Sequence, residues 1–349
     1  MSTDSLHARG AERTLGAPRS GASGRGRAVS VFCGAFLVLL LVCLASLAFG
    51  HKSVAFGDLV DVLTGDGDPY LELVIDSRIE RTLLAVGVGA ALAVAGALMQ
   101  GVTMNPLADP GLFGVNAGAA AAMVTASAWF GVSAGTTTSV WIALLGAAAA
   151  VLVVHTIGTA GSAGASVVRL VLAGAVVAAI LTAYVQAVAL RMPQHFDNYR
   201  YWVVGSLGNG RLDQLTLVLP FIAVGLLLAL ACSSGLNALA LGQESATALG
   251  VNTLWTRAGA LGAATLMSAA ATAAVGPIAF VGLAVPHIVR ALVGLDMRRQ
   301  ILGCLLIGPS VVLVADIVGR PQELMIGVMT AFVGAPALLL AVRRLGDRA

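Results

Sequence analysis

The chain consists of long apolar runs separated by short polar segments. Ten runs approach the roughly 20 residues that a helix needs to cross the ~30 Å hydrocarbon core of a bilayer. They lie at 28–49, 82–101, 112–132, 139–158, 166–189, 215–232, 257–275, 277–295, 300–318 and 324–342. The runs do not alternate as barrel strands do, and only a helix satisfies its own backbone hydrogen bonds in lipid. The pattern predicts an all-α polytopic membrane protein with ten transmembrane helices over residues 28–345.

Composition supports a membrane protein. Hydrophobic residues make up 58% of the 349 residues and charged residues 11%, with a mean hydropathy of +0.93. A soluble domain carries about 25% charged residues, so the composition disfavours a soluble enzyme, a disordered chain or a nucleic-acid binder. The net charge of +3 is too small to indicate a polyanionic partner. The four cysteines lie inside apolar runs without metal-like spacing, which predicts packing residues, no disulfide framework and no metal site.

The N-terminal segment is expected to stay attached to the protein. Its apolar run at 28–49 is longer than the ~7–15 residues of a signal-peptide core and follows a long basic lead, so we interpret it as an uncleaved anchor. Residues 1–27 are rich in Ser, Gly and Arg and have no apolar face. We expect them to form a disordered basic cytoplasmic tail that at most touches anionic lipid.

The distribution of basic residues predicts the orientation of the chain. With the N-terminus in the cytoplasm, ten spans return the C-terminus there, and 13 of the 20 Lys and Arg residues lie on the cytoplasmic side. Lys and Arg favour cytoplasmic loops. We therefore expect both termini to be cytoplasmic.

An internal repeat joins the two halves of the chain. Residues 105–112 (NPLADPGL) and 276–283 (GPIAFVGL) share the pattern [NG]-P-[LI]-A-x-x-G-L. The matching prolines and glycines are each 171 residues apart. Five spans separate the copies, so they point in opposite directions, as in the inverted repeats of many transporters. The repeat residues are Asn105, Pro106, Pro110 and Gly111 in one copy, and Gly276, Pro277 and Gly282 in the other. Coincidence in a chain rich in Gly and Ala is the alternative.

Chemistry inside the spans is sparse. Asp109 and Asp316 lie at predicted span ends, and His287 lies within the eighth, where a structural role is favoured. This scarcity of ionisable residues disfavours an ion-coupled carrier, since ionisable residues within spans usually mark function.

The chain's one lysine, Lys52, lies outside any glycine loop, so no phosphate-binding P-loop exists. No metalloprotease or nucleophile-elbow motif occurs either, and we expect a non-enzymatic chain without its own cofactor. If ATP drives it, a separate ATPase subunit uses the ATP and Mg²⁺.

Two polar segments are candidate partner sites. The cytoplasmic loop 236–251 alternates polar and apolar residues at helical spacing, which predicts two short helices suited to a partner's groove. An ordinary interfacial loop is the alternative. On the outer side, Arg78, Arg81 and Arg320 are positioned to pair with carboxylates of an external partner. Snorkelling to lipid headgroups is the alternative for them.

These residues resemble the signature of the FecCD family. The similarity is carried by residues 78–83 (RIERTL), 94–111 (VAGALMQGVTMNPLADPG), 201–207 (YWVVGSL), 239–251, 276–290 and 315–336, in order over about 54–345. Members of this family are permeases of binding-protein-dependent ABC importers for ferric siderophores, haem and vitamin B12. Two departures stand out: Glu80 replaces the family's usual proline between two arginines, where it would partly neutralise them, and Met325 occupies another common proline position.

The resemblance implies a type II importer with two ten-helix subunits, two cytoplasmic ATP-binding subunits and an extracytoplasmic substrate-binding lipoprotein. It implies an ATPase-coupling loop formed by Leu241, Gly242, Glu244, Ala246, Leu249 and Gly250. It also assigns Arg78, Arg81 and Arg320 to binding-protein docking. The second permease subunit is either another copy or a sister protein.

We therefore expect the transmembrane permease subunit of an ATP-driven importer that moves a ferric siderophore complex across the cytoplasmic membrane. Vitamin B12 or another corrinoid is the first alternative cargo, and haem is the second. From other classes, an ion-coupled secondary transporter would need buried charges that the spans lack. A non-transporting scaffold would not explain the inverted repeat.

Overall fold

The computed structural model describes residues 21–50, 57, 61–62, 64, 68–160, 167–193, 202–208, 212–322 and 324–346. Its helices are α1 (Gly21–Ala48), α3 (Pro69–Thr103), α4 (Val115–Phe130), α5 (Thr137–Thr159), α6 (Val167–Arg191), α8 (Leu212–Leu239), α9 (Gln243–Ala248), α10 (Thr253–Val275), α11 (Val281–Val293), α12 (Met297–Gly319) and α13 (Ile326–Gly346), with 3₁₀ turns η1 (Pro110–Phe113) and η2 (Arg320–Gln322). These residues contain no strand, which confirms the all-α fold class.

Each predicted apolar run coincides with one helix. Seven helices are long and apolar enough to cross a membrane, and three of the matched helices (α4, α11 and the apolar part of α13) are shorter. The expected count of ten spans is therefore approximate, while the multi-pass membrane architecture is confirmed.

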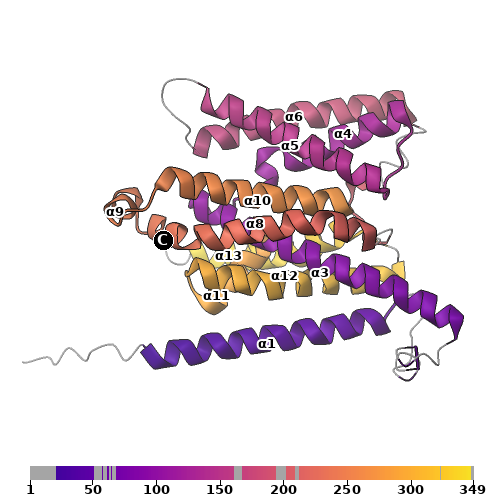
Figure 1. The fold of residues 1–349 in the computed structure, drawn as a ribbon, viewed down its shortest axis with the longest axis horizontal. Coiled ribbons are helices and arrows are strands. Elements are labelled where there is room, and N and C mark those ends of the chain that lie inside the picture. The colour runs from indigo at the N-terminus through magenta and orange to yellow at the C-terminus, as the bar shows by residue number, and fades with distance from the viewer. Residues whose placement is uncertain are drawn as a thin grey trace, which may run out of the picture.

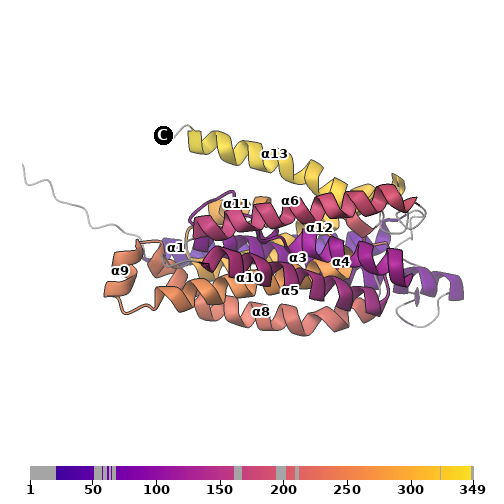
Figure 2. The same cartoon turned by 90° about the horizontal axis from the view of Figure 1, so that it is seen from above.

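α3 is the central helix of the bundle. Its most apolar 18-residue window is 83% buried, the largest fraction among the candidate spans. α8, α10, α11 and α12 surround it, whereas α1 lies along the edge beside α12 and α4–α6 form a separate layer (Figure 1). Viewed from above, α8 and α13 lie on opposite faces of the bundle (Figure 2).

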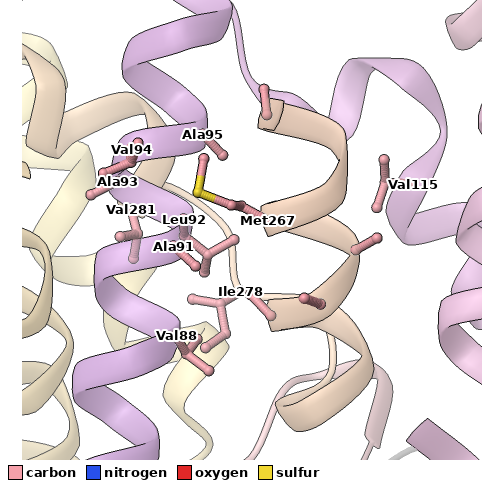
Figure 3. Packing of buried hydrophobic residues seen from close by; sticks show 14 of the residues in the cluster. Val88, Ala91, Leu92, Ala93, Val94, Ala95, Val115, Met267, Ile278 and Val281 are labelled. Atoms are coloured by element: carbon pink, nitrogen blue, oxygen red, sulfur yellow. The ribbon is translucent and has the colours of Figure 1, made fainter. Parts of the chain in front are cut away.

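Small side chains allow α3 to pack closely against its neighbours. Met267 of α10 points toward α3 near Leu92 and Ala95 (Figure 3), and all three side chains are buried. A methyl group added at Gly96 would collide with the backbone carbonyl of Gly282, in the first turn of α11. Packing of this kind replaces the hydrophobic driving force that is missing between helices in lipid.

Different helix ends gather at the two ends of the bundle. The start of α1, the short helix α9 and the end of α13 lie at one end, whereas α3 starts at the other (Figures 1 and 2). α10 starts beside α9, so α3 and α10 run in opposite directions, as the inverted repeat predicts. The start of α1 and the end of α13 lie at the same end, which agrees with an even number of crossings.

Several helices extend beyond the apolar runs that predicted them. α3 begins at Pro69 instead of residue 82, because the Asp68 side chain accepts a hydrogen bond from the Tyr70 amide (3.1 Å) and proline suits the first helical position. α1 begins at Gly21, so residues 21–27 of the predicted tail are helical. Residues 1–20 lie outside the described part of the chain.

Candidate functional site

The C-terminus of α1 is capped by arginines from two other helices. α1 has no basic residue in its last turn, so its final carbonyls need outside donors. Arg320 donates from Nη1 to the carbonyls of Ser46 (2.6 Å) and Phe49 (2.8 Å). Arg78 donates from Nη1 to the carbonyls of Leu47 (2.7 Å) and Ala48 (3.1 Å). Positive charge at this position also complements the negative end of the helix dipole.

Asp316 joins two of the arginines into one ion-pair network. Its carboxylate accepts from Arg81 Nε at 3.0 Å to each oxygen, and from Arg320 Nε at 2.8 Å. Its side chain is 1% exposed. Arg320 Nη2 additionally donates to Ser46 Oγ at 2.7 Å, and that hydroxyl lies 2.7 Å from Thr82 Oγ1. We call Arg78, Arg81, Arg320, Asp316 and Ser46 the arginine cluster.

The three arginines differ in their exposure. Arg78 and Arg320 are 8% and 7% exposed, whereas the side chain of Arg81 is 26% exposed. The two buried guanidinium groups are engaged with α1, so Arg81 is the member of the set that presents the most surface.

Glu80 takes no part in the hydrogen bonds that define this network. Among the described residues, the carboxylate that pairs with Arg81 is that of Asp316. Glu80 is adjacent to Arg81 and two positions from Arg78, and helix residues at those spacings do not face each other. In the described part of the chain, the acid that pairs with Arg81 and Arg320 is therefore Asp316, and not the acid expected from the sequence.

The predicted coupling loop lies at the other end of the bundle. α9 stands at that end, beside the end of α8 and the start of α10 (Figure 1). Gly242 (φ 105°) precedes α9 and Gly250 (φ 79°) follows it, so both bends use backbone conformations that favour glycine. Ala246 is buried and fixes α9 against the bundle, whereas Leu241 and Leu249 are 68% and 66% exposed. Glu244, in the first turn of α9, is also exposed.

The expectation of two short helices in this loop is wrong. α8 continues to Leu239, beyond the predicted span end at residue 232, and α9 is the one short helix in 236–251. The first half of the predicted pattern thus belongs to a long membrane helix that extends past the apolar run.

An unpredicted polar contact anchors the base of this loop. Asn237, near the end of α8, donates to the carboxylate of Asp296 (3.1 Å) and accepts from the Met297 amide (2.7 Å). The other oxygen of Asp296 accepts from the Arg299 amide at 2.9 Å and caps α12. The end of α8 is thereby fixed to the start of α12.

The first copy of the repeat forms a tight, internally bonded turn. Asn105 Oδ1 accepts from the Leu107 amide (2.9 Å), and Asp109 Oδ1 accepts from the Gly111 amide (2.8 Å). Pro106 lies within this turn, and Pro110 begins η1. These contacts end α3 and restart the chain as α4.

The second copy touches the first. A side chain at Gly282 would approach Asp109 Oδ2 (3.1 Å) and Pro110 Cδ (3.3 Å), and Gln100 of α3 donates to the Gly282 carbonyl at 3.2 Å. Gly276 (φ 79°) breaks the chain between α10 and α11, followed by Pro277. The two helix interruptions therefore meet in the interior of the bundle.

The tryptophan motif at 202–207 packs against the same interruption. The Ser206 amide donates to the Val275 carbonyl at 2.8 Å, and Gly205 has φ 77°. A side chain at Gly276 would collide with the Trp202 carbonyl, and one at Gly327 with the Val204 carbonyl. Three segments that are distant in sequence thus meet where α10 ends.

His287 has a structural contact. Its Nδ1 lies 3.0 Å from the Leu283 carbonyl, one turn earlier in α11. Among the described residues, no group of three or more His, Cys, Asp or Glu side chains is arranged to hold a metal ion.

Sequence reasoning identified the three arginines but missed their partners. The four-residue spacing of Asp316 and Arg320 was a usable signal, because helix residues at that spacing face each other. The contact of Arg320 with Ser46 and the α1 carbonyls carries no such signal, since it joins segments more than 270 residues apart. The anchor formed by Asn237 and Asp296 is likewise invisible in local sequence.

Known proteins share both the sequence and the fold. A family model for the FecCD transport family matches residues 37–344. The chain is 42% identical to the ferric enterobactin transport system permease protein FepD of Escherichia coli, over 91% of this chain and 96% of that protein. It is 33% identical to the probable siderophore transport system permease protein YfiZ of Bacillus subtilis (90% and 96% covered) and 36% identical to the hemin transport system permease protein HmuU of Yersinia pestis (88% and 94% covered).

The fold matches a solved transporter. A structure described as a metal-chelate type ABC transporter in an inward-facing conformation superposes with a TM-score of 0.79 at 26% identity, over 90% of this chain and 99% of that one. Together with the two-ended bundle and the joined repeat motifs, these matches establish that the chain belongs to the FecCD transport family.

Proposed function

We propose that this chain is the transmembrane permease subunit of an ATP-driven importer for a ferric siderophore complex. The observation that carries the proposal is the 42% identity, along nearly the whole chain, to a permease for ferric enterobactin. The related Fe(3+)-citrate and hemin permeases are 35% and 36% identical, so the metal chelate is the shared cargo chemistry and haem is the second candidate.

The energy for transport comes from a separate ATPase that contacts α9. The exposed Leu241 and Leu249 flank this helix, and Glu244 adds an acidic group between them. Apolar side chains that protrude at a bundle end fit a partner's groove. Gly242 and Gly250 set the bends that present them, and Ala246 attaches the element to the bundle. The chain itself binds no cofactor, and the partner uses ATP and Mg²⁺.

The arginine cluster receives the substrate-binding lipoprotein at the opposite end. Arg81 makes direct contact with carboxylates of the lipoprotein, because it is the more exposed of the three arginines. Arg78 and Arg320 hold the end of α1 and Asp316 in place behind it. A guanidinium group on this surface accelerates association with an acidic partner and fixes its orientation.

The remaining assembly follows from these two ends. The α9 end faces the cytoplasm together with both termini, in the cytoplasmic membrane. A second permease subunit, either another copy or a sister protein, completes the path. ATP binding closes the two ATPase subunits and moves α9, and the anchor between Asn237 and Asp296 carries that movement into α8 and α12.

Transport by the reconstituted complex tests the proposal. Proteoliposomes containing this chain, its ATPase and the loaded binding protein should accumulate ⁵⁵Fe from a ferric siderophore only with ATP and Mg²⁺. A panel of ferric catecholate, ferric hydroxamate, ferric citrate, haem and cobalamin identifies the cargo. Uptake by the permease alone, driven by an ion gradient, would refute the ATP-driven mechanism.

A further inference from the structure

An apolar groove lies between α5, α8 and α10 and reaches α9 at one end. It has a volume of about 940 Å³ and is lined mainly by Leu, Ala, Val and aromatic side chains. Trp141 and Phe221 meet edge to face across it, with ring centroids 6.0 Å apart. Two of the helices that line it, α5 and α8, lie on the side of the bundle opposite α13 (Figure 2).

The groove has a cation near one mouth. Arg257, in the second turn of α10, lines it together with Gln243 of α9 and His155 near the end of α5. Nε of Arg257 is shielded from solvent and has no hydrogen-bond partner among the described residues. No Asp or Glu is among the described residues that line the groove. A guanidinium group offers five N–H donors, and a buried donor without an acceptor is costly.

The length of the groove fits one acyl chain. Along α10 its lining repeats at every fourth residue, at Arg257, Leu261, Thr265 and Ala269. From Arg257 to Ala269 the helix rises by twelve residue steps, or about 18 Å. One leaflet of the hydrocarbon core is about 15 Å deep, half of the ~30 Å total. Arg257 therefore lies at headgroup depth when the chain of a lipid fills the apolar part.

We propose that this groove is a binding site for an anionic phospholipid, whose phosphate pairs with Arg257 while an acyl chain occupies the space between α5 and α10. Basic pockets between transmembrane helices are the general form of such sites. The lipid satisfies the unpartnered donor and covers apolar surface that faces the membrane. Because the site adjoins α9, the lipid also stabilises the end of the bundle where α10 begins.

Three variants and two controls separate the contribution of the headgroup from that of the acyl chain. Arg257→Gln removes the phosphate contact, and its control is Arg299→Gln, which removes an exposed arginine from the same end of the bundle. Gly262→Leu fills the groove, because a side chain added at Gly262 meets no atom within 4 Å. Its control is Gly34→Leu on α1, where a side chain also meets nothing within 4 Å. Ala258→Leu, at another exposed position of the groove, repeats the blocking test with a smaller change.

Lipid retention measures the site directly. Each full-length variant is reconstituted into nanodiscs of mixed phosphatidylglycerol and phosphatidylcholine and then extracted into detergent. The lipid that stays bound per protein is quantified by mass spectrometry. We expect wild type and both controls to retain phosphatidylglycerol selectively. Arg257→Gln should lose about tenfold in affinity, the value of one charged hydrogen bond. The two groove-filling variants should retain less lipid of either kind.

The alternative results overturn the proposal. If Arg257→Gln and Arg299→Gln retained the same amount of phosphatidylglycerol, Arg257 would contribute no more than any surface charge. Equal retention of both lipids would exclude an anionic site. Displacement of phosphatidylglycerol by inorganic phosphate alone would identify a phosphate site instead of a lipid site. Thermal unfolding of every variant in the same detergent shows whether a loss of lipid merely reflects a loss of fold; unfolding of both Gly262→Leu and Ala258→Leu would contradict the open groove.

Discussion

Asp316 and Arg320 form a buried ion pair one helical turn apart, with 2.6 Å between Asp316 Oδ2 and Arg320 Nη2. The same Arg320 caps the carbonyls at the end of α1, so the pair connects α12 to α1. A lone arginine at this depth would carry an uncompensated charge. Asp316 supplies the compensation for both Arg320 and Arg81, which makes it the residue on which the cluster depends.

Asp316→Asn should therefore destabilise the protein strongly. The amide keeps the shape of the side chain but leaves two arginines without their counter-charge, and removing one partner of a buried pair costs about 3–5 kcal/mol. Thermal or denaturant unfolding in detergent measures the change. Glu80→Gln is the control, because its removal leaves the ion pair intact. Equal stability of the two variants would show that the pair contributes nothing to the fold.

Arg78→Gln and Arg81→Gln should separate stability from docking. Arg78→Gln removes the hydrogen bonds to two α1 carbonyls and should cost about 1–3 kcal/mol of unfolding free energy.

Arg81→Gln leaves Asp316 paired with Arg320, so we expect a loss of less than about 1 kcal/mol of unfolding free energy. Its main effect should be a slower, less salt-dependent association with the binding protein, measured by stopped-flow fluorescence. An unchanged association rate in Arg81→Gln would contradict its proposed contact with the lipoprotein.

Gly96→Ala should disrupt the approach of α3 to α11. The added methyl group collides with the backbone carbonyl of Gly282, which cannot rotate away as a side chain would. Overpacking of this kind costs about 1–3 kcal/mol. Gly34→Ala on α1 has open space around it and should leave the melting temperature unchanged or slightly raised. Detergent-based thermal shift compares the two, and a harmless Gly96→Ala would show that the helices are not in close contact there.

Leu249→Asp should uncouple ATP hydrolysis from uptake without unfolding the chain. Leu249 is 66% exposed, so the charge requires no burial in the free subunit, but it would oppose insertion into an apolar groove of the ATPase. We expect loss of uptake and of co-purification with the ATPase, with a change in stability below about 0.5 kcal/mol. Leu295→Asp is the matched control, since Leu295 is 76% exposed in the α11–α12 turn outside α9. Equal loss of ATPase binding in both variants would show that α9 is not the contact.

Hydropathy predicted the membrane helices well but misplaced their ends. The apolar run at 82–101 marks only the part of α3 that lies in the interior, whereas Asp68 and Pro69 set its true start. Residues such as Arg78 and Arg81 score as loop by polarity. They nevertheless continue the helix, because the guanidinium groups find partners on α1 and α12.

The sequence identified the residues of the candidate sites but not the contacts that they make. The three arginines were identified as exposed docking groups, yet Arg78 and Arg320 are almost fully buried. Whether a charged side chain reaches solvent or a neighbouring carbonyl depends on which helices pack beside it. The pairing of Arg81 with Asp316 spans 235 positions, a separation that no local pattern encodes.

The sequence alone determined the class of protein, the succession of apolar helices and the inverted repeat, because the bilayer imposes a length and a polarity that each segment must meet independently. Only the tertiary structure decided that the two repeat copies touch, that Asp316 neutralises two arginines, and that Arg257 lines an apolar groove. Each of these depends on helices that are far apart in the chain, and their contacts are set by the shapes of small side chains packed together.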